Sequence, residues 1–163
     1  MKTLNIIETS TPAEARLARM KKFDMFPVIK FLEREGISNS KAKELCDALL
    51  QWLAGHAALE HQTAYVMLHG DIDKAFHAFV LHTKLYASFC KEYVGFFIHH
   101  TPLDSQQANS EEVLAGVAYT TNFLDSEFKQ LHPLLREWVE LARAGLVTVS
   151  AVSCVKNGYP DET

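Results

Sequence analysis

Hydrophobic residues recur along most of the chain every three or four positions, which is the spacing of one face of an α-helix, and glycine and proline separate the periodic stretches. Thr11, Pro12 and Ser40 are typical of helix starts, because hydroxyl side chains cap free backbone amides and proline suits the first helical turn. Gly36 and Gly55 are typical of helix ends. The pattern predicts helices over residues 12–22, 27–35, 40–55 and 72–94, from residue 110 onward, and over 134–144.

The longest uninterrupted pattern lies between Ile72 and Val94, where neither proline nor glycine occurs. We predict one continuous helix over this span, with Asp71 as its N-cap and Gly95 at its end. At 1.5 Å per residue this helix would be roughly 34 Å long and would be the central element of the fold.

One side of this predicted helix is apolar. Phe79, Tyr86 and Cys90 fall on it when each residue turns the helix by about 100°. We therefore expect these three residues to be among the most buried in the protein. Lys84 and Lys91 fall elsewhere on the helix and are expected to be exposed, because lysine is almost never fully buried without a partner.

The remaining stretches are less regular. Residues 56–69 fit either a continued helix or an extended segment, and the polar residues 101–109 predict a loop. The tail from residue 146 contains β-branched residues, which predict a short strand or an extended arm. The expected fold is all-α: an irregular bundle of about five or six helices with a short extended C-terminal tail, in a single helical domain over residues 1–163.

Composition and charge narrow the function classes. With 163 residues, 48% hydrophobic and 22% charged, the chain is globular in composition. A net charge of −4 argues against sequence-independent nucleic-acid binding. No apolar run approaches the roughly 18–20 residues that span a bilayer, and the first residues do not resemble a signal peptide. Cys46, Cys90 and Cys154 are odd in number and far apart, which favours reduced thiols. We expect a cytoplasmic protein without a membrane or nucleic-acid partner.

Residues 70–100 carry the densest candidate chemistry, because they hold four of the eight histidines together with Cys90, Tyr86, Asp71 and Asp73. His82, Tyr86 and Cys90 are spaced by four residues and follow one edge of the predicted helix. Asp73 and His77 are also four residues apart but point roughly the opposite way. The candidates for binding a partner or ligand are Asp71, Asp73, His77, His82 and Tyr86.

A metal site is the alternative interpretation of this segment, because histidine and cysteine are preferred ligands of zinc and other borderline-soft metals. Its candidate ligands are His77, Cys90, His99 and His100, and zinc or iron would be the metal. No tight ligand spacing such as CxxC occurs, and His82 and Cys90 would lie about 12 Å apart along the helix. We expect Asp73 and His77 to form a local contact. No three of the following side chains are expected to meet at one point: His77, His82, Cys90, His99 and His100.

Residues 71–102 also form an ordered motif. It begins with two aspartates and the pair Phe76–His77, continues with a tyrosine, Cys90 and Gly95, and ends with two histidines and Pro102. In this order the segment resembles the glycine-rich-domain-containing-protein-like family. That family more often has tryptophan at the position of Phe76, and no glycine-rich tail is present here. The resemblance implies no biochemical activity, so the motif residues fit either a site or local structural contacts.

Small size, acidic charge and the lack of a recognisable catalytic motif favour a non-enzymatic module that binds another protein, as an inhibitor, adaptor or immunity-type factor would. The alternative is a metal-binding or metal-dependent protein that uses a His/Cys/Asp cluster in residues 71–100. The sequence leaves open whether the protein is an enzyme, and a homo-oligomer fits either interpretation.

Overall fold

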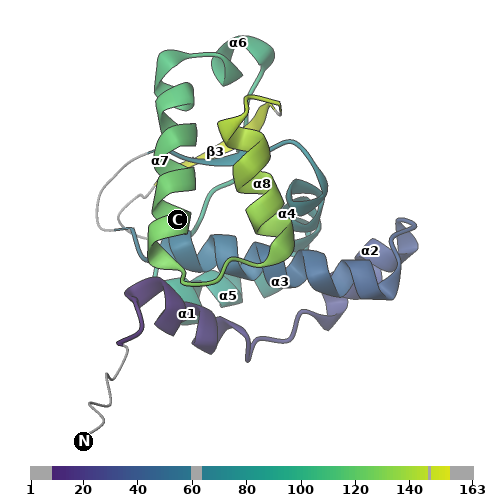
Figure 1. Cartoon of the computed structure of the whole chain (residues 1–163). Helices are drawn as coiled ribbons and strands as arrows, with labels where there is room; N and C mark the ends of the chain where they lie inside the picture. The colour runs from purple at the N-terminus through teal and green to yellow at the C-terminus, as the bar shows by residue number, and fades with distance from the viewer. Residues whose placement is uncertain (1–8, 60–63, 147, 155–163) are drawn as a thin grey trace, which may run out of the picture.

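The computed structural model describes residues 9–59, 64–146 and 148–154, and it confirms the mostly helical fold class. The helices of this part of the chain are α1 (Pro12–Met20), α2 (Phe26–Arg34), α3 (Asn39–Ala57), α4 (Asp71–Leu81), α5 (Thr83–Phe89), the π-helix η1 (Cys90–Val94), α6 (Ser105–Ala108), α7 (Glu111–Glu127) and α8 (Pro133–Arg143) (Figure 1). The strands are β1 (Ala64–Leu68), β2 (Thr101–Pro102) and β3 (Val149–Cys154).

Helix α3 lies at the centre of the core, where it packs against α1, α2, α4 and α8 (Figure 1). It begins after Ser38, whose side chain accepts a hydrogen bond from a backbone amide, so Ser40 is not its cap. Gly55 does not end the helix as expected. A Cβ at Gly55 would lie 2.7 Å from Tyr65 Oη and 2.9 Å from a methyl of Leu124, so glycine here permits close packing against β1 and α7.

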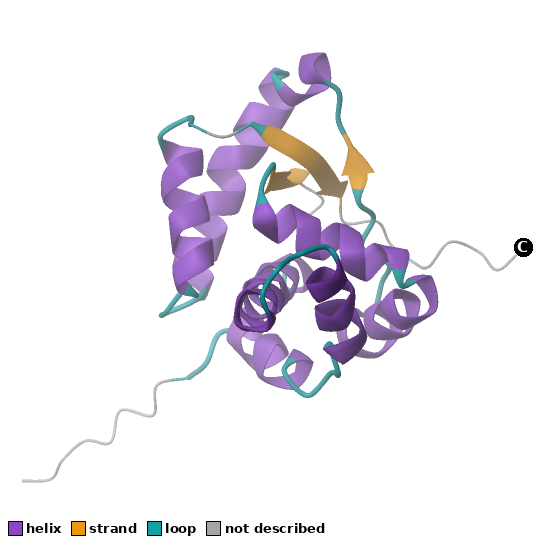
Figure 2. Cartoon of the chain, turned by 90° about the vertical axis from the view of Figure 1, so that its right-hand side faces the viewer, coloured by secondary structure: helices purple, strands orange, loops and turns teal. Residues whose placement is uncertain are grey.

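Three segments that are far apart in the sequence form a small antiparallel sheet in the order β1–β3–β2, beside the helices (Figure 2). The stretch 56–69, which the sequence left undecided, contains the end of α3 and strand β1. The loop predicted over residues 101–109 instead contains β2 and α6, so that prediction is wrong. The C-terminal tail supplies the central strand β3, and residues 155–163 lie outside the described residues.

The predicted continuous helix over residues 72–94 is broken at His82, so this prediction is also wrong. His82 has φ −80° and ψ 67°, which separates α4 from α5. Its imidazole Nδ1 lies 2.6 Å from the carbonyl oxygen of Ala78, and its ring packs edge-on against Phe31 of α2. Apolar periodicity shows which side of a helix is buried, but it does not detect a side chain that competes for a backbone carbonyl.

The start and the end of the segment that was predicted as one helix, residues 72–94, also differ from the prediction. The N-cap of α4 is Gly70, and Asp71 is the first helical residue, with its carboxylate 3.4 Å from Lys74 Nζ. At the other end, the amide of Gly95 donates to the carbonyl of Cys90 at 2.8 Å, which closes the wider turn of a π-helix. Gly95 then ends the helix with φ 92°, in the left-handed region that favours glycine.

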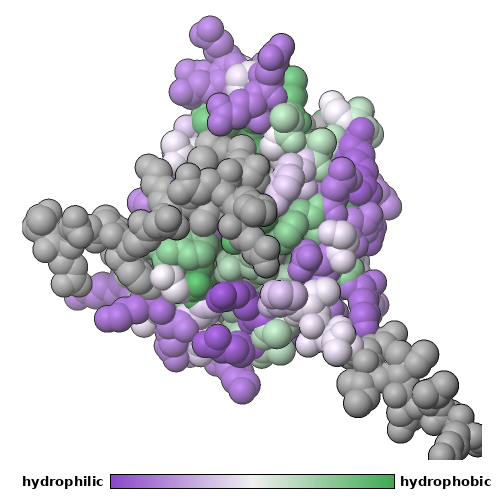
Figure 3. All heavy atoms as spheres, turned by 90° about the vertical axis from the view of Figure 1, so that its left-hand side faces the viewer, coloured by the Kyte–Doolittle hydropathy of each residue, from purple (hydrophilic) through white to green (hydrophobic). Residues whose placement is uncertain are grey.

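The burial expected for this region is confirmed. Phe79 and Cys90 are fully buried, Tyr86 is 1% exposed, and Lys84 and Lys91 are exposed. On the face seen in Figure 3, apolar side chains gather near the centre, between polar side chains. Within the described residues, none of the helices has the length and apolar character needed to cross a membrane.

Candidate metal centre

The chain folds back after Gly95, and this return places Phe96 against His56 of α3 and Phe97 against Tyr86 of α5. The hydroxyl of Tyr86 donates a hydrogen bond to the backbone carbonyl of Ile98, which fixes the returning segment to the core. Two residues later, the ring of His100 packs against Phe76, with 4.6 Å between ring centroids. His100 therefore arrives beside the first two turns of α4, which carry Asp73 and His77.

Asp73, His77 and His100 bring three potential ligand atoms together, all within 4.8 Å of one another. Asp73 Oδ1 lies 3.3 Å from His100 Nε2 and 3.6 Å from His77 Nε2. The two imidazole rings are nearly perpendicular, with 4.5 Å between their centroids. An ion about 2.1 Å from each donor in a tetrahedral site would hold the donors about 3.4 Å apart. The two separations from Asp73 Oδ1 are close to that value, within a group whose ligand atoms lie up to 4.8 Å apart.

Burial differs sharply among the three side chains. The side chain of His100 is 6% exposed and that of Asp73 is 9% exposed, whereas that of His77 is 53% exposed. Asp73 Oδ1 and both ring nitrogens of His100 are buried, and none has a hydrogen-bond partner among the described residues. The 3.3 Å contact between them thus lacks hydrogen-bond alignment. Buried polar atoms without a partner cost about 1–3 kcal/mol each, and a bound cation would satisfy Asp73 Oδ1 and one of the two ring nitrogens of His100.

The electrostatics favour metal ligation by His100, whereas the raised pKa of Asp73 opposes the ionised carboxylate that a metal binds. Burial raises the pKa of Asp73, while His77, the Ser150 hydroxyl and His69 act in the opposite direction. Burial, and to a smaller extent the nearby His77, lowers the pKa of His100 to about 4. His100 is therefore neutral at pH 7, and a neutral imidazole has the free lone pair that a metal requires.

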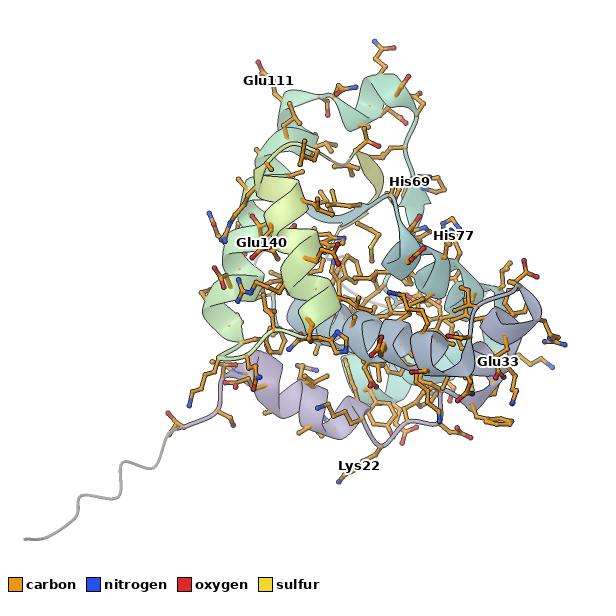
Figure 4. All side chains as sticks on the ribbon, turned by 45° about the vertical axis from the view of Figure 1, so that its right-hand side comes forward. Lys22, Glu33, His69, His77, Glu111 and Glu140 are labelled. Atoms are coloured by element: carbon orange, nitrogen blue, oxygen red, sulfur yellow. The ribbon has the colours of Figure 1, made fainter. Side chains whose placement is uncertain are left out.

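The site opens to solvent through a cleft of about 400 Å³ between α4, α6 and β3. Asp73 and His77 line it, and His69, Ser105, Asn109 and Ser150 provide polar groups on its other sides. Figure 4 shows His69 and His77 on the same side of the molecule, at the end of β1 and on α4 respectively. The backbone amide of His69 donates to the carbonyl of Thr148 at 2.9 Å, which fixes the position of this residue on the sheet.

The structure separates the four metal ligands named from the sequence. His77 and His100 come together, with Asp73 as the third member, whereas Cys90 and His99 are not part of this group. Cys90 is fully buried, and burial raises the pKa of its thiol, which opposes the thiolate form that metals bind. The ring of His99 packs against Phe97 instead.

The other partner or ligand candidates also lie apart from this group. Asp71 is exposed and contacts Lys74, His82 breaks the helix, and Tyr86 is a core residue. The expected local contact between Asp73 and His77 is present, and the i, i+4 spacing was the signal for it. His69 was not among the candidates, and no local sequence pattern connects it to Asp73.

Comparison with known proteins identifies a family for this chain, but no individual protein that matches it. Neither a curated protein nor a solved structure matches the chain. Residues 15–133 match the UCP032817-like family, and nothing supports the glycine-rich-domain-containing-protein-like family, so that resemblance was wrong. Because this match covers more than half of the chain, including α4 and His100, the protein belongs to the UCP032817-like family.

Proposed function

We propose that this protein binds a divalent transition metal through Asp73, His77 and His100. One observation carries the proposal: buried ligand atoms of Asp73 and His100, which have no hydrogen-bond partner in the described chain, face each other within 4.8 Å of a third ligand. The geometry therefore favours the metal-binding alternative as the first candidate function.

The donor set narrows the choice of metal to zinc or iron. Two imidazoles and one carboxylate are the ligands of many catalytic zinc sites and of non-haem Fe(II) sites. Both kinds of site keep coordination positions for water or a ligand. Here the exposed side of His77 and the adjoining cleft leave such positions accessible. A structural zinc site would require a fourth protein ligand, and the group contains three.

Metal analysis of the purified protein and titration with Co²⁺ test the proposal. We expect one ion per chain, with affinity more than about 100-fold weaker in Asp73→Asn and His77→Ala. Asp71→Asn is the matched control, because Asp71 is an exposed aspartate on the same helical turn and outside the group. Equal Co²⁺ affinity in Asp73→Asn and the wild type would contradict the proposal.

Binding of a protein partner is the second candidate function. A groove of about 770 Å³ runs between α1, α2, α3 and the segment before α8, and its walls include Leu17, Phe23 and Ile29. Phe26, on its rim, is 57% exposed, which is unusual for a large apolar side chain. A photo-crosslinking residue at position 26 is expected to give discrete products with a partner or a second copy in cells. The same residue at the exposed Glu112 should not, and identical products at both positions would contradict this candidate.

The cytoplasmic setting expected from the sequence also remains a proposal. Cys46 and Cys90 are both buried free thiols, as expected in a reducing compartment. Fluorescence microscopy of a tagged full-length chain in its native cell would test it, and exclusion of the tag from the cytoplasm would contradict it.

A further inference from the structure

A second cavity, smaller and apolar, adjoins the cleft of the candidate metal centre. It has a volume of about 190 Å³ and lies between α3, the start of α4 and α8. Most of its lining is apolar, formed by Leu45, Leu68, Ile72, Leu134, Trp138 and Leu141, and Lys41, Asp71 and Glu137 line the remainder. A concave apolar cavity of this kind next to a few converging polar groups is the usual form of a small-molecule site.

The two cavities share one wall. His69 lines both of them, and Figure 4 shows this residue beside α4 on the side that carries His77. The first turn of α4 also separates them: Asp71 and Ile72 line the apolar cavity, and the next residue, Asp73, lines the cleft. A ligand on the ion is therefore separated from the apolar cavity by His69 and the first turn of α4.

The charge of the site favours an anionic head group. One carboxylate from Asp73 and two neutral imidazoles leave a net charge of about +1 on a divalent ion. An oxygen anion bound from the cleft side would neutralise that charge and fill an open coordination position. The charged residues that line the apolar cavity are Lys41, Asp71 and Glu137, which together carry no net positive charge, so this cavity suits the uncharged end of the same molecule.

We propose that the ligand of this site is a small monocarboxylate with an apolar tail, whose carboxylate binds the ion while its tail passes His69 and lies against Ile72 and Trp138. This inference rests on the proposed metal function and adds the ligand class. It assigns the walls of the apolar cavity a role in specificity, and His69 a position in contact with the bound ligand.

Titration of the Co²⁺-loaded protein with acetate, butyrate, hexanoate and octanoate tests the inference, with the visible spectrum of cobalt reporting carboxylate binding. Affinity is expected to rise about threefold to fourfold for each methylene that enters the cavity, until the cavity is full. In Leu141→Phe, which fills the cavity, hexanoate and octanoate should lose most of this gain while acetate affinity stays the same. Leu134→Phe is a second filling variant if the first does not fold.

Leu114→Phe is the matched control, because Leu114 is 54% exposed on α7 and lines neither cavity. It should bind all four acids as the wild type does. Equal affinity for the four acids in the cobalt-loaded wild type would overturn this inference and leave the metal function standing. Absence of cobalt binding would overturn both.

Discussion

The imidazole of His82 donates from Nδ1 to the carbonyl oxygen of Ala78 at 2.6 Å, where the backbone amide of His82 would bind in an unbroken helix. That amide instead donates to the carbonyl of Phe79 at 3.0 Å. The side chain thus takes over the helical hydrogen bond of its own backbone. As a result, the chain turns between α4 and α5 without leaving the Ala78 carbonyl unpaired.

His82→Ala is therefore expected to lower the free energy of unfolding by about 1–2 kcal/mol, because the Ala78 carbonyl loses its partner while packing against α2 holds the break in place. Urea denaturation measures this loss. Metal affinity should be unchanged, because His82 is not in the Asp73–His77–His100 group. A gain in stability with added helix content would show that the break depends on His82 alone.

Because the ligand atoms of His100 have no hydrogen-bond partner within the described residues, we expect them to lower the stability of the metal-free protein while they allow it to bind a metal. His100→Phe should keep the ring packing against Phe76 and remove two buried nitrogens without partners. We expect the metal-free variant to be as stable as the wild type or about 1 kcal/mol more stable. Excess Zn²⁺ at 100 times Kd should stabilise only the wild type, by about 2.7 kcal/mol, and a chelator should reverse it. Thermal unfolding with and without Zn²⁺ measures both effects, and equal stabilisation of the two proteins would contradict the prediction.

Gly55→Ala should destabilise the protein despite the higher helix propensity of alanine. The new Cβ would lie 2.7 Å from Tyr65 Oη, which donates to the Trp52 carbonyl at 2.9 Å. Overpacking costs about 1–3 kcal/mol, against a propensity gain of about 0.5–1 kcal/mol. In a Tyr65→Phe background the added cost should be smaller, because the clashing oxygen is gone. An equal cost in both backgrounds, measured by chemical denaturation, would assign the clash to Leu124 alone.

His56 predicts a pH dependence of stability. It is fully buried among Trp52, Tyr65 and Phe96, neither ring nitrogen has a partner among the described residues, and burial lowers its pKa to about 3. The unfolded chain, with a histidine pKa near 6.5, then binds a proton that the folded protein does not. The contribution of His56 to the free energy of unfolding is complete above about pH 6.5 and is lost as the pH falls from there toward 3.

The limiting slope of this loss is about 1.4 kcal/mol per pH unit for one proton. His56→Phe should remove that part of the pH dependence, and the difference between the two unfolding curves isolates it from other groups. Parallel curves between pH 4 and 6.5 would show that His56 is not a neutral buried residue in the folded protein.

Local sequence patterns determined the helical class, several helix boundaries and the burial of the longest periodic stretch. Thr11 caps α1 by accepting from the Glu14 amide, and its own amide donates to the Glu14 carboxylate. Ser110 caps α7 in a similar way, because such caps depend only on residues within one turn. Phe79, Tyr86 and Cys90 are buried because helical periodicity fixes which side chains share a face.

Only the tertiary structure decided the break at His82, the sheet and the candidate site. The β-branched tail predicted a short strand as one of two alternatives, and β3 lies there, but its partners β1 and β2 come from distant segments that the sequence did not connect to it. The Asp73–His77 pair was visible as an i, i+4 spacing, but the place of His100 depends on the return of the chain after Gly95. Sequence spacing limits distance within one helix. Between elements, distance is set by packing of the whole core, and for that reason the residue that joins His77 and His100 is Asp73 and not Cys90.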